Sequence, residues 1–258
     1  MNCCSDDFTI NYNRCMDVIK VLDNYYINKK ELADISYPSN ILYKSKEYYL
    51  YMFYSCLLDY GMRSKIYHEN LSNTYNLYPN IFEPSYVVNM NKDELREIIV
   101  SNIHPRYPNV AVNKWIKLSL ELVKYGNILE YLKSINSILE LNKFIIGLKS
   151  YGQKTGGLLI RIIMDSCICD FNECIDSIPI DRHDIEISYL VQVINKSKIT
   201  NNEIKLLSDA YVKTGIELGI NPSLIDKYLW EIGNGFCNKN NCLDCPLQKY
   251  CSSERLVH

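Results

Sequence analysis

The stretch Leu148-Lys-Ser-Tyr-Gly-Gln-Lys-Thr-Gly-Gly157, continued by LLIRIIMD, joins two helical patterns through a turn. It predicts a helix, a tight turn containing Gly152, and a second helix whose first turn holds Lys154 and Thr155. Backbone N–H groups at the start of such a helix form a natural cradle for a phosphate. The helix dipole disfavours a positive charge on Lys154, which favours the neutral, nucleophilic amine. The alternative is an ordinary helical corner with a solvated lysine.

Helical patterns continue on both sides of this stretch and account for most of the chain. The predicted helices cover residues 41–60, 64–75, 91–103, 108–126, 128–135, 137–148, 181–194, 200–219 and 221–232. Several of them begin with capping signals, such as Asn91 with Glu94 and Thr200 with Glu203. No segment alternates convincingly as a strand, although the short piece Ser85–Met90 is compatible with an extended chain. The sequence therefore predicts an all-α fold.

A second motif, Ile178-Pro-Ile-Asp-Arg-His-Asp184, stands directly before an apolar helical pattern. Asp181 is expected at the N-cap of that helix and His183 in its first turn. Capping alone explains an aspartate there, because its side chain accepts hydrogen bonds from backbone N–H groups whatever the function. The motif on its own therefore leaves structural and functional interpretations open.

Four cysteines close the chain in the run FCNKNNCLDCPLQKYC (236–251), with the spacing C-x4-C-x2-C-x5-C. They are Cys237, Cys242, Cys245 and Cys251. Zinc sites usually combine two short Cys or His pairs on separate knuckles, whereas unevenly spaced cysteines in one loop suit the corner irons of a [4Fe–4S] cluster. The loop therefore predicts a [4Fe–4S] cluster, with zinc as the alternative. Cys167, Cys169 and Cys174 are a weaker candidate for a second metal set, and Cys3 and Cys4 have no assigned role.

The order of these motifs resembles the helix-hairpin-helix DNA glycosylases of the endonuclease III type. Their hairpin has the pattern L-P-G-V-G-x-K-T-A, which Gly152, Lys154 and Thr155 match, with Ser150 in place of the first glycine. Their catalytic aspartate lies in V-D-x-H, which the segment around Asp181 matches closely. A Leu-Trp-x-x-Gly helix end and the cysteine loop follow in the same order, although the first cysteine spacing is shorter than usual. The resemblance covers residues 148–251.

The resemblance implies a mechanism. Lys154 would attack C1′ of a damaged nucleotide and form a Schiff base, which permits subsequent strand cleavage. Asp181 would stabilise the developing sugar cation and help to activate the lysine. The target base would be flipped out of the stack. The partner would be double-stranded DNA containing a damaged base or an abasic site, bound by a monomer.

The resemblance also suggests DNA contacts and a division into domains. The hairpin residues Ser150, Gly152 and Thr155 would bind phosphate, with His183 as a further contact. Arg63 and Lys65 are candidate backbone contacts, Tyr60 or Met62 a candidate wedge, and the basic stretch His104, Arg106, Lys114 and Lys117 a candidate phosphate surface. Each also has an ordinary interpretation as a loop or solvated helix residue. The expected domains are a helical barrel lobe at 45–145, and a hairpin and cluster lobe formed by 1–44 and 146–258.

Composition limits the function classes further. The 258 residues are 47% hydrophobic and carry a net charge of −2, so any nucleic-acid site must be a local basic patch. We expect no signal peptide and no membrane span. Eleven cysteines without a secretory signal favour a reducing compartment, and we expect a cytoplasmic protein.

Two other functions remain open. One is a non-catalytic iron–sulfur protein that binds nucleic acid. The other is an iron–sulfur nuclease, because RecB-like exonucleases also end in C-x2-C-x5-C. Such a nuclease requires a β-sheet that carries metal-binding acids, which the sequence does not display.

Overall fold

The fold is built from helices. The computed structural model describes residues 7–27, 35–58, 64–169, 175 and 177–252. Within these ranges the chain forms helices, turns and one isolated β-bridge between Ile10 and Ile194, without a strand. The prediction of an all-α fold is therefore confirmed. None of the described helices is long and apolar enough to cross a membrane.

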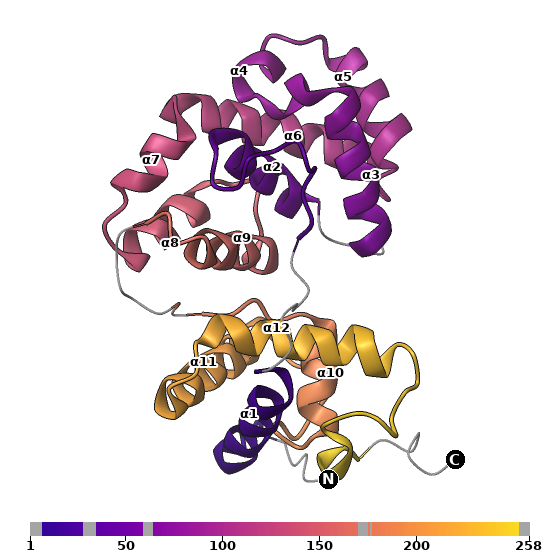
Figure 1. Cartoon of the computed structure of the whole chain (residues 1–258), viewed down its shortest axis with the longest axis vertical. Coiled ribbons are helices and arrows are strands. Elements are labelled where there is room, and N and C mark those ends of the chain that lie inside the picture. The colour runs from indigo at the N-terminus through magenta and orange to yellow at the C-terminus, as the bar shows by residue number, and fades with distance from the viewer. Residues whose placement is uncertain (1–6, 28–34, 59–63, 170–174, 176, 253–258) are drawn as a thin grey trace, which may run out of the picture. The chain divides into compact units, whose positions relative to one another are not determined.

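By its internal contacts the chain divides into two compact units. The central unit comprises residues 35–173, and the terminal unit combines 1–34 with 174–258. Figure 1 shows the helices that belong to each unit. The turn around Gly152 lies in the central unit, whereas the domains expected from the sequence place it with the cysteine loop.

The central unit consists of eight α-helices and three short helical turns among its described residues. These are α2 (Lys46–Leu57), α3 (Ser64–Leu77), η1 (Pro79–Phe82), α4 (Pro84–Val87), α5 (Lys92–Ile98), η2 (Ile99–Ile103), α6 (Pro108–Leu122), η3 (Val123–Tyr125), α7 (Ile128–Ser134), α8 (Ile138–Gly147) and α9 (Gln153–Asp165).

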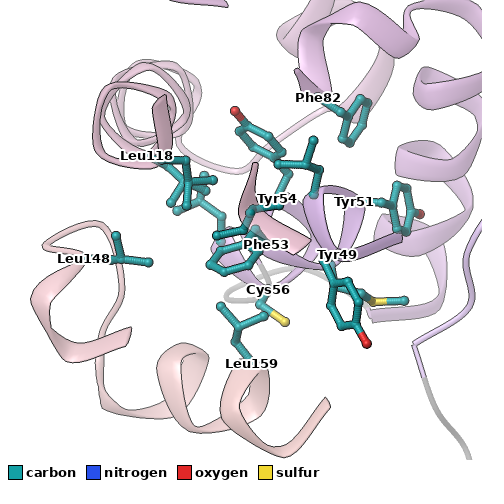
Figure 2. Packing of buried hydrophobic residues seen from close by; sticks show 14 of the residues in the cluster. Tyr49, Tyr51, Phe53, Tyr54, Cys56, Phe82, Leu118, Leu148 and Leu159 are labelled. Atoms are coloured by element: carbon teal, nitrogen blue, oxygen red, sulfur yellow. The ribbon is translucent and has the colours of Figure 1, made fainter. Parts of the chain in front are cut away.

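Helix α2 is the centre of this unit, because every residue from Tyr48 to Leu57 is buried. Figure 2 shows Phe53 and Cys56 directed toward Leu159 of α9. Trp115 of α6 is fully buried, stacks on Tyr54 with ring centroids 4.4 Å apart, and donates its indole N–H to the carbonyl of Ile81. A helix that is apolar on all sides must be enclosed by others, and α2 satisfies that condition.

Three buried tyrosines of this core have hydroxyl groups that are hydrogen-bonded to nearby oxygens. Tyr49 donates to Ser166 at 2.8 Å, and Tyr67 donates to the carbonyl of Ser55 at 2.7 Å. The hydroxyls of Tyr54 and Ser119 lie 2.6 Å apart. A buried hydroxyl without a partner is costly, so these bonds allow a tyrosine-rich sequence to form a dense core.

The terminal unit contains four described α-helices and two short turns. They are α1 (Tyr12–Tyr26), α10 (Arg182–Leu190), α11 (Asn201–Leu218), α12 (Pro222–Ile232), η4 (Gly233–Cys237) and η5 (Gln248–Tyr250). Cys15, Val18, Ile19 and Leu22 form the buried face of α1. The hydroxyl of Tyr228 in α12 donates to Asp23 of α1 at 2.9 Å, which ties the first helix to the last.

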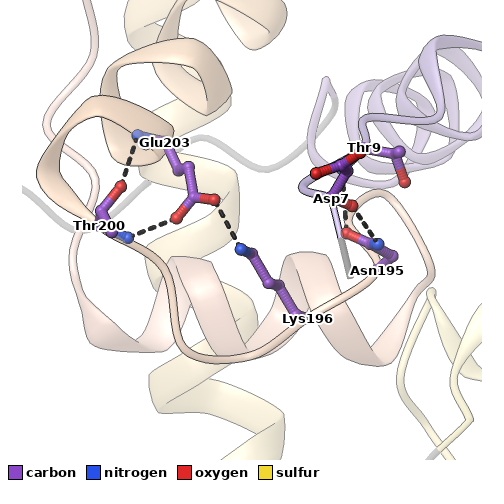
Figure 3. Close-up of polar contacts among 6 residues, drawn as sticks. All are labelled: Asp7, Thr9, Asn195, Lys196, Thr200 and Glu203. Atoms are coloured by element: carbon purple, nitrogen blue, oxygen red, sulfur yellow. Dashed lines mark hydrogen bonds and ion pairs between the residues drawn. The ribbon is translucent and has the colours of Figure 1, made fainter. Parts of the chain in front are cut away.

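Polar contacts fasten the start of the described chain to the segment after α10 (Figure 3). The side chain of Asn195 accepts from the N–H of Thr9 at 3.0 Å and donates to the carbonyl of Asp7 at 2.8 Å. Nearby, Glu203 closes the capping box of α11 by accepting from the N–H of Thr200 at 2.7 Å, and it also pairs with Lys196 at 2.6 Å. The capping box that the sequence predicts is present.

Some predicted elements differ from the structure. Helix α2 begins at Lys46 rather than 41, because Lys44 has a left-handed backbone (φ 65°) and the Ser45 hydroxyl accepts from the N–H of Tyr48. Helix α10 ends at Leu190 rather than 194, because the N–H groups of Val193 and Ile194 both turn back to the carbonyl of Ser188.

Two further segments differ from the sequence-based expectations. The segment 85–90 is not extended: Pro84 starts the short helix α4, and turns follow. Helix α1 is absent from the predicted helices, although Asn11 provides a cap that accepts from the N–H of Arg14 at 3.1 Å.

Candidate active site

The predicted turn between two helices is present and connects α8 to α9. The N–H of Leu148 bonds back to the end of α8, and the N–H of Tyr151 donates to the carbonyl of Leu148 at 3.1 Å. Gly152 is the N-cap of α9, and its N–H donates to the hydroxyl of Thr155 at 3.1 Å. Thr155 therefore stabilises the turn from within, and Lys154 follows in the first turn of α9.

Gly152 is not required by the local backbone or by packing. Its φ of −98° is accessible to any residue, and a Cβ atom added there would meet nothing within 4 Å. Glycine usually marks a left-handed backbone or a close approach. Gly152 is exposed, and the space beside it is open.

Ser150, at the position of the missing glycine, faces inward. Only 3% of its surface is exposed, and its hydroxyl donates to Glu121 of α6 at 3.0 Å. The other carboxylate oxygen of Glu121 accepts from the N–H of Lys149 at 3.1 Å. The hydroxyl of Ser150 is thus already used inside the protein.

Tyr151 anchors the turn to a second helix. Its hydroxyl donates to the carbonyl of Phe53 in α2 at 2.5 Å. Burial, followed by the nearby Cys56 and other ionisable groups, raises the pKa of Tyr151 well above its usual value. The hydroxyl therefore stays protonated and remains a donor. Lys154 is half-buried in the helix that this anchored turn begins.

Asp181 caps α10 in the terminal unit, as the sequence predicts. One of its carboxylate oxygens accepts from the N–H of His183 at 2.7 Å and from that of Asp184 at 3.2 Å. The Asp184 carboxylate in turn accepts from the N–H of Asp181 at 2.7 Å. These bonds fix the orientation of the Asp181 side chain, and a negative charge is favourable at the N-terminus of a helix.

His183 packs on the glycine of the Leu-Trp-x-x-Gly motif. A Cβ atom on Gly233 would lie 3.3 Å from the Cβ of His183 and 3.8 Å from Ile187. The bare backbone at Gly233 therefore lets α10 approach η4 closely. The two motifs, which are 50 residues apart in the sequence, support each other within the terminal unit.

The four cysteines of the terminal loop are half-buried. The loop is wound by short turns, such as the N–H of Cys245 to the carbonyl of Cys242 at 3.2 Å. Its end is fastened by the N–H of Ser252, which donates to Leu190 at 2.8 Å, and by the Arg14 guanidinium, which lies 4.8 Å from the centre of the Tyr250 ring.

The thiols of the loop influence one another electrostatically. Burial raises the pKa of Cys237 to about 11, with further contributions from Cys245, Cys251 and Cys242. Four such thiols in one loop are the donor set that a [4Fe–4S] cluster takes. Among the residues that the structure describes, no group of three His, Cys, Asp or Glu side chains is gathered tightly enough to hold a single metal ion.

The remaining candidate DNA contacts lie partly outside the described residues. Arg63, Tyr60 and Met62, like Cys3, Cys4 and Cys174, lie outside the described residues. Lys65 is exposed and lies 4.0 Å from Glu69. Its assignment as a DNA contact, like that of His183, stays a prediction.

The basic stretch of α6 reaches the turn. Lys117 donates to the carbonyl of Lys149 at 3.0 Å. Burial and the neighbouring Lys117 lower the pKa of Lys114. Arg106 lies over the ring of Tyr107, with its guanidinium carbon 5.3 Å from the ring centre. The sequence pointed to these lysines but missed Glu121 and Tyr151, whose partners lie 29 and 98 residues away along the chain.

Comparisons with known proteins define the fold. No protein family model and no curated protein sequence matches the chain. Solved structures do match. A non-covalent complex of endonuclease III with DNA aligns over 97% of this chain and 100% of its own, with 14% identity and a TM-score of 0.64.

Two DNA glycosylases also align over most of their length. A thermostable thymine-DNA glycosylase covers 93% of this chain and 96% of its own, with 13% identity and a TM-score of 0.61. The alignment with the 8-oxoguanine DNA glycosylase of Methanocaldococcus jannaschii covers 87% of this chain and 98% of that enzyme's chain, with 17% identity and a TM-score of 0.58. The chain has the all-helical fold of the helix-hairpin-helix DNA glycosylases.

Proposed function

We propose that this protein is a DNA repair glycosylase that removes a damaged or modified base from double-stranded DNA and then cleaves the abasic strand as an AP lyase. The observation that carries the proposal is the place of Lys154. It lies half-buried in the first turn of α9, behind a turn whose glycine leaves open space, in a chain with the DNA glycosylase fold. A lysine in that place is the amine that lyase chemistry requires.

The chemistry assigns a role to each motif residue. The neutral amine of Lys154 attacks C1′ of a flipped nucleotide, the glycosidic bond breaks, and the base leaves with a proton. Loss of an amine proton and opening of the sugar ring give a Schiff base. Removal of a C2′ proton then expels the 3′ phosphate. Asp181, oriented by its capping bonds, stabilises the positive charge that develops on the sugar.

We further propose that Cys237, Cys242, Cys245 and Cys251 hold a [4Fe–4S] cluster. The support is the chemistry of the donor set, four half-buried thiols within one short loop. When bound, the cluster would cross-link the loop that follows α12, and its role would be structural. The loop contacts α1 through Tyr250 and α10 through Ser252. A cluster that ordered the loop would therefore also stabilise α10, which Asp181 caps.

The two alternatives have less support. A RecB-like nuclease needs a β-sheet that carries metal-binding acids, and the described residues form helices and one isolated bridge. A non-catalytic binder would share the fold, and only a test of turnover separates it from the enzyme.

The deciding experiment is a cleavage screen over duplexes that each carry one lesion or one abasic site, with borohydride trapping. We expect wild-type protein to form a covalent adduct with DNA and Lys154→Gln to form none. Asp181→Asn should bind DNA but turn over slowly. Lys149→Gln is the matched control, because it removes an exposed lysine from the same turn. A wild-type protein that forms no adduct and cleaves no duplex would favour the non-catalytic binder.

A further inference from the structure

Helix α6 holds the turn from its inner side. Glu121 is half-buried, and its two carboxylate oxygens accept one bond each, from the N–H of Lys149 and from the hydroxyl of Ser150. Because Ser150 is buried, these contacts lie on the side of the turn that faces the protein. The glycine that commonly occupies this position has no hydroxyl, so the contact through Ser150 depends on the serine of this chain.

Lys117, one helical turn before Glu121, holds the next peptide group. Its amine donates to the carbonyl of Lys149 at 3.0 Å. In a trans peptide the carbonyl oxygen and the following N–H point in opposite directions, and the described chain contains no cis peptide. The N–H of Ser150 must therefore point away from the amine of Lys117.

The N–H of Ser150 differs from the N–H groups of the two residues that follow it. The N–H of Tyr151 is bound to the carbonyl of Leu148, and that of Gly152 is bound to Thr155. The N–H of Ser150 has no acceptor among the described residues. The second anchor, from Tyr151 to Phe53, fixes the same turn to α2.

We propose that Glu121 and Lys117 are positioning residues that aim the N–H of Ser150 at a phosphate of the DNA backbone. This role rests on the proposed glycosylase function. The bond from the N–H of Lys149 to Glu121 fixes the peptide before Lys149, and the bond from the amine of Lys117 to the carbonyl of Lys149 fixes the peptide after it. The bond from the Ser150 hydroxyl to Glu121 fixes the side chain of Ser150. A donor held in this way binds an anion without first being ordered, which preserves affinity. The open space beside Gly152 leaves room for the phosphate to approach.

The test measures binding to a duplex with a non-cleavable abasic-site analogue, in which single phosphates are replaced in turn by uncharged methylphosphonates. We expect wild-type protein to lose affinity at the phosphate that the turn contacts. Glu121→Ala should bind about tenfold more weakly, since two charge-assisted bonds are lost, and should no longer respond to that replacement.

Two variants separate positioning from charge. Glu121→Gln should stay within about threefold of wild type and keep the response, because its amide can accept from Lys149 and donate to Ser150. Glu130→Ala removes the same charge from α7, where the partner is Lys133 at 3.1 Å, and should leave the response unchanged. If Glu121→Ala does not fold, Ser150→Ala removes the hydroxyl alone and should weaken the same response.

Tighter binding by Glu121→Ala would show that the carboxylate repels the phosphate, which would overturn the proposal. An unchanged methylphosphonate response in Glu121→Ala, or in Ser150→Ala where that variant has to be used, would overturn it as well. In both cases wild-type binding would leave the proposed glycosylase function intact. A wild-type protein that binds no abasic duplex would instead contradict that function, and the role of Glu121 with it.

Discussion

Gly233 packs so closely on His183 that a Cβ atom added to the glycine would lie only 3.3 Å from the Cβ of the histidine. The first turn of α10 therefore packs directly on the backbone of Gly233. This contact lies two residues from Asp181, whose carboxylate caps the same helix. The position of the proposed catalytic carboxylate thus depends on a residue that has no functional group. Gly233 supports the site because it has no side chain that would press against His183.

Gly233→Ala should destabilise the protein and slow its turnover. The added methyl group overpacks the contact with His183, at a cost of about 1–2 kcal/mol in the free energy of unfolding. Gly235→Ala is the control, because its Cβ would meet nothing within 4 Å and it lies in the same short helix η4. Chemical denaturation of both variants should show the difference. Equal stability of the two would contradict the proposed role of Gly233.

Two substitutions at Asp181 should separate capping from catalysis. Asparagine is also a good N-cap, so Asp181→Asn should keep most of the stability, whereas Asp181→Ala should lose about 1 kcal/mol. Both variants should lose about 100-fold or more in base excision, because neither carries the charge that stabilises the sugar cation. If the excision rates of the two variants followed their stabilities and not the loss of charge, Asp181 would be only a structural cap.

Tyr151→Phe should loosen the anchored turn. Loss of the hydroxyl removes the bond that Tyr151 donates to the carbonyl of Phe53, which should lower the free energy of unfolding by about 1–2 kcal/mol. The hydroxyl of Tyr51 is also buried but has no hydrogen-bond partner among the described residues. Tyr51→Phe should therefore be neutral or slightly stabilising. Denaturant titrations that ranked the two variants in the opposite order would exclude Tyr151 as an anchor.

Serine substitution of any loop cysteine should abolish a broad visible absorbance and reduce the bound iron in protein purified without oxygen. Cys167→Ser, at an exposed cysteine outside the loop, should keep both. The physical reason is that a [4Fe–4S] cluster needs four thiolates, one for each iron. A colourless wild-type protein with stoichiometric zinc would assign the loop to zinc instead.

Glu203 should make the stability of the terminal unit sensitive to acid. Its bonds to Lys196 and to the N–H of Thr200 hold the pKa of Glu203 below its ordinary value. A lowered pKa in the folded state means a contribution that is present above the ordinary pKa of glutamate and is lost as the pH falls through the folded value. The stability of Glu203→Gln should therefore fall less steeply in acid than that of the wild type. Denaturation of both proteins at several pH values measures the difference. An identical pH profile for the two proteins would refute this.

Local signals explain what the sequence reveals. The starts of α9, α10 and α11 depend on residues within three positions of each cap, such as Asp181 with Asp184 and Thr200 with Glu203. The cap of α1 at Asn11 is a weaker signal, because no acidic residue follows in the first turn. Helix α2 lacks an amphipathic pattern because all its sides are buried, so only the left-handed Lys44 and the cap at Ser45 define its start.

Contacts across long stretches of sequence could not be predicted. The bond from Ser150 to Glu121 joins residues that are 29 positions apart, and the packing of His183 on Gly233 depends on how two helices meet. A serine in place of a glycine looks like a defect in the hairpin motif until its partner is known. Residues that support a site without belonging to it form no recognisable motif, because many different side chains can provide the same support.

The burial of Trp115 has a practical consequence for the study of folding. The chain has two tryptophans, and Trp115 lies fully buried in the central unit while Trp230, 36% exposed, lies in the terminal unit. Each unit therefore carries its own fluorescent probe, and single Trp→Phe variants make either one observable alone. Coincident transitions of the two probes would mark the chain as one cooperative unit, and separate transitions would give each half its own stability.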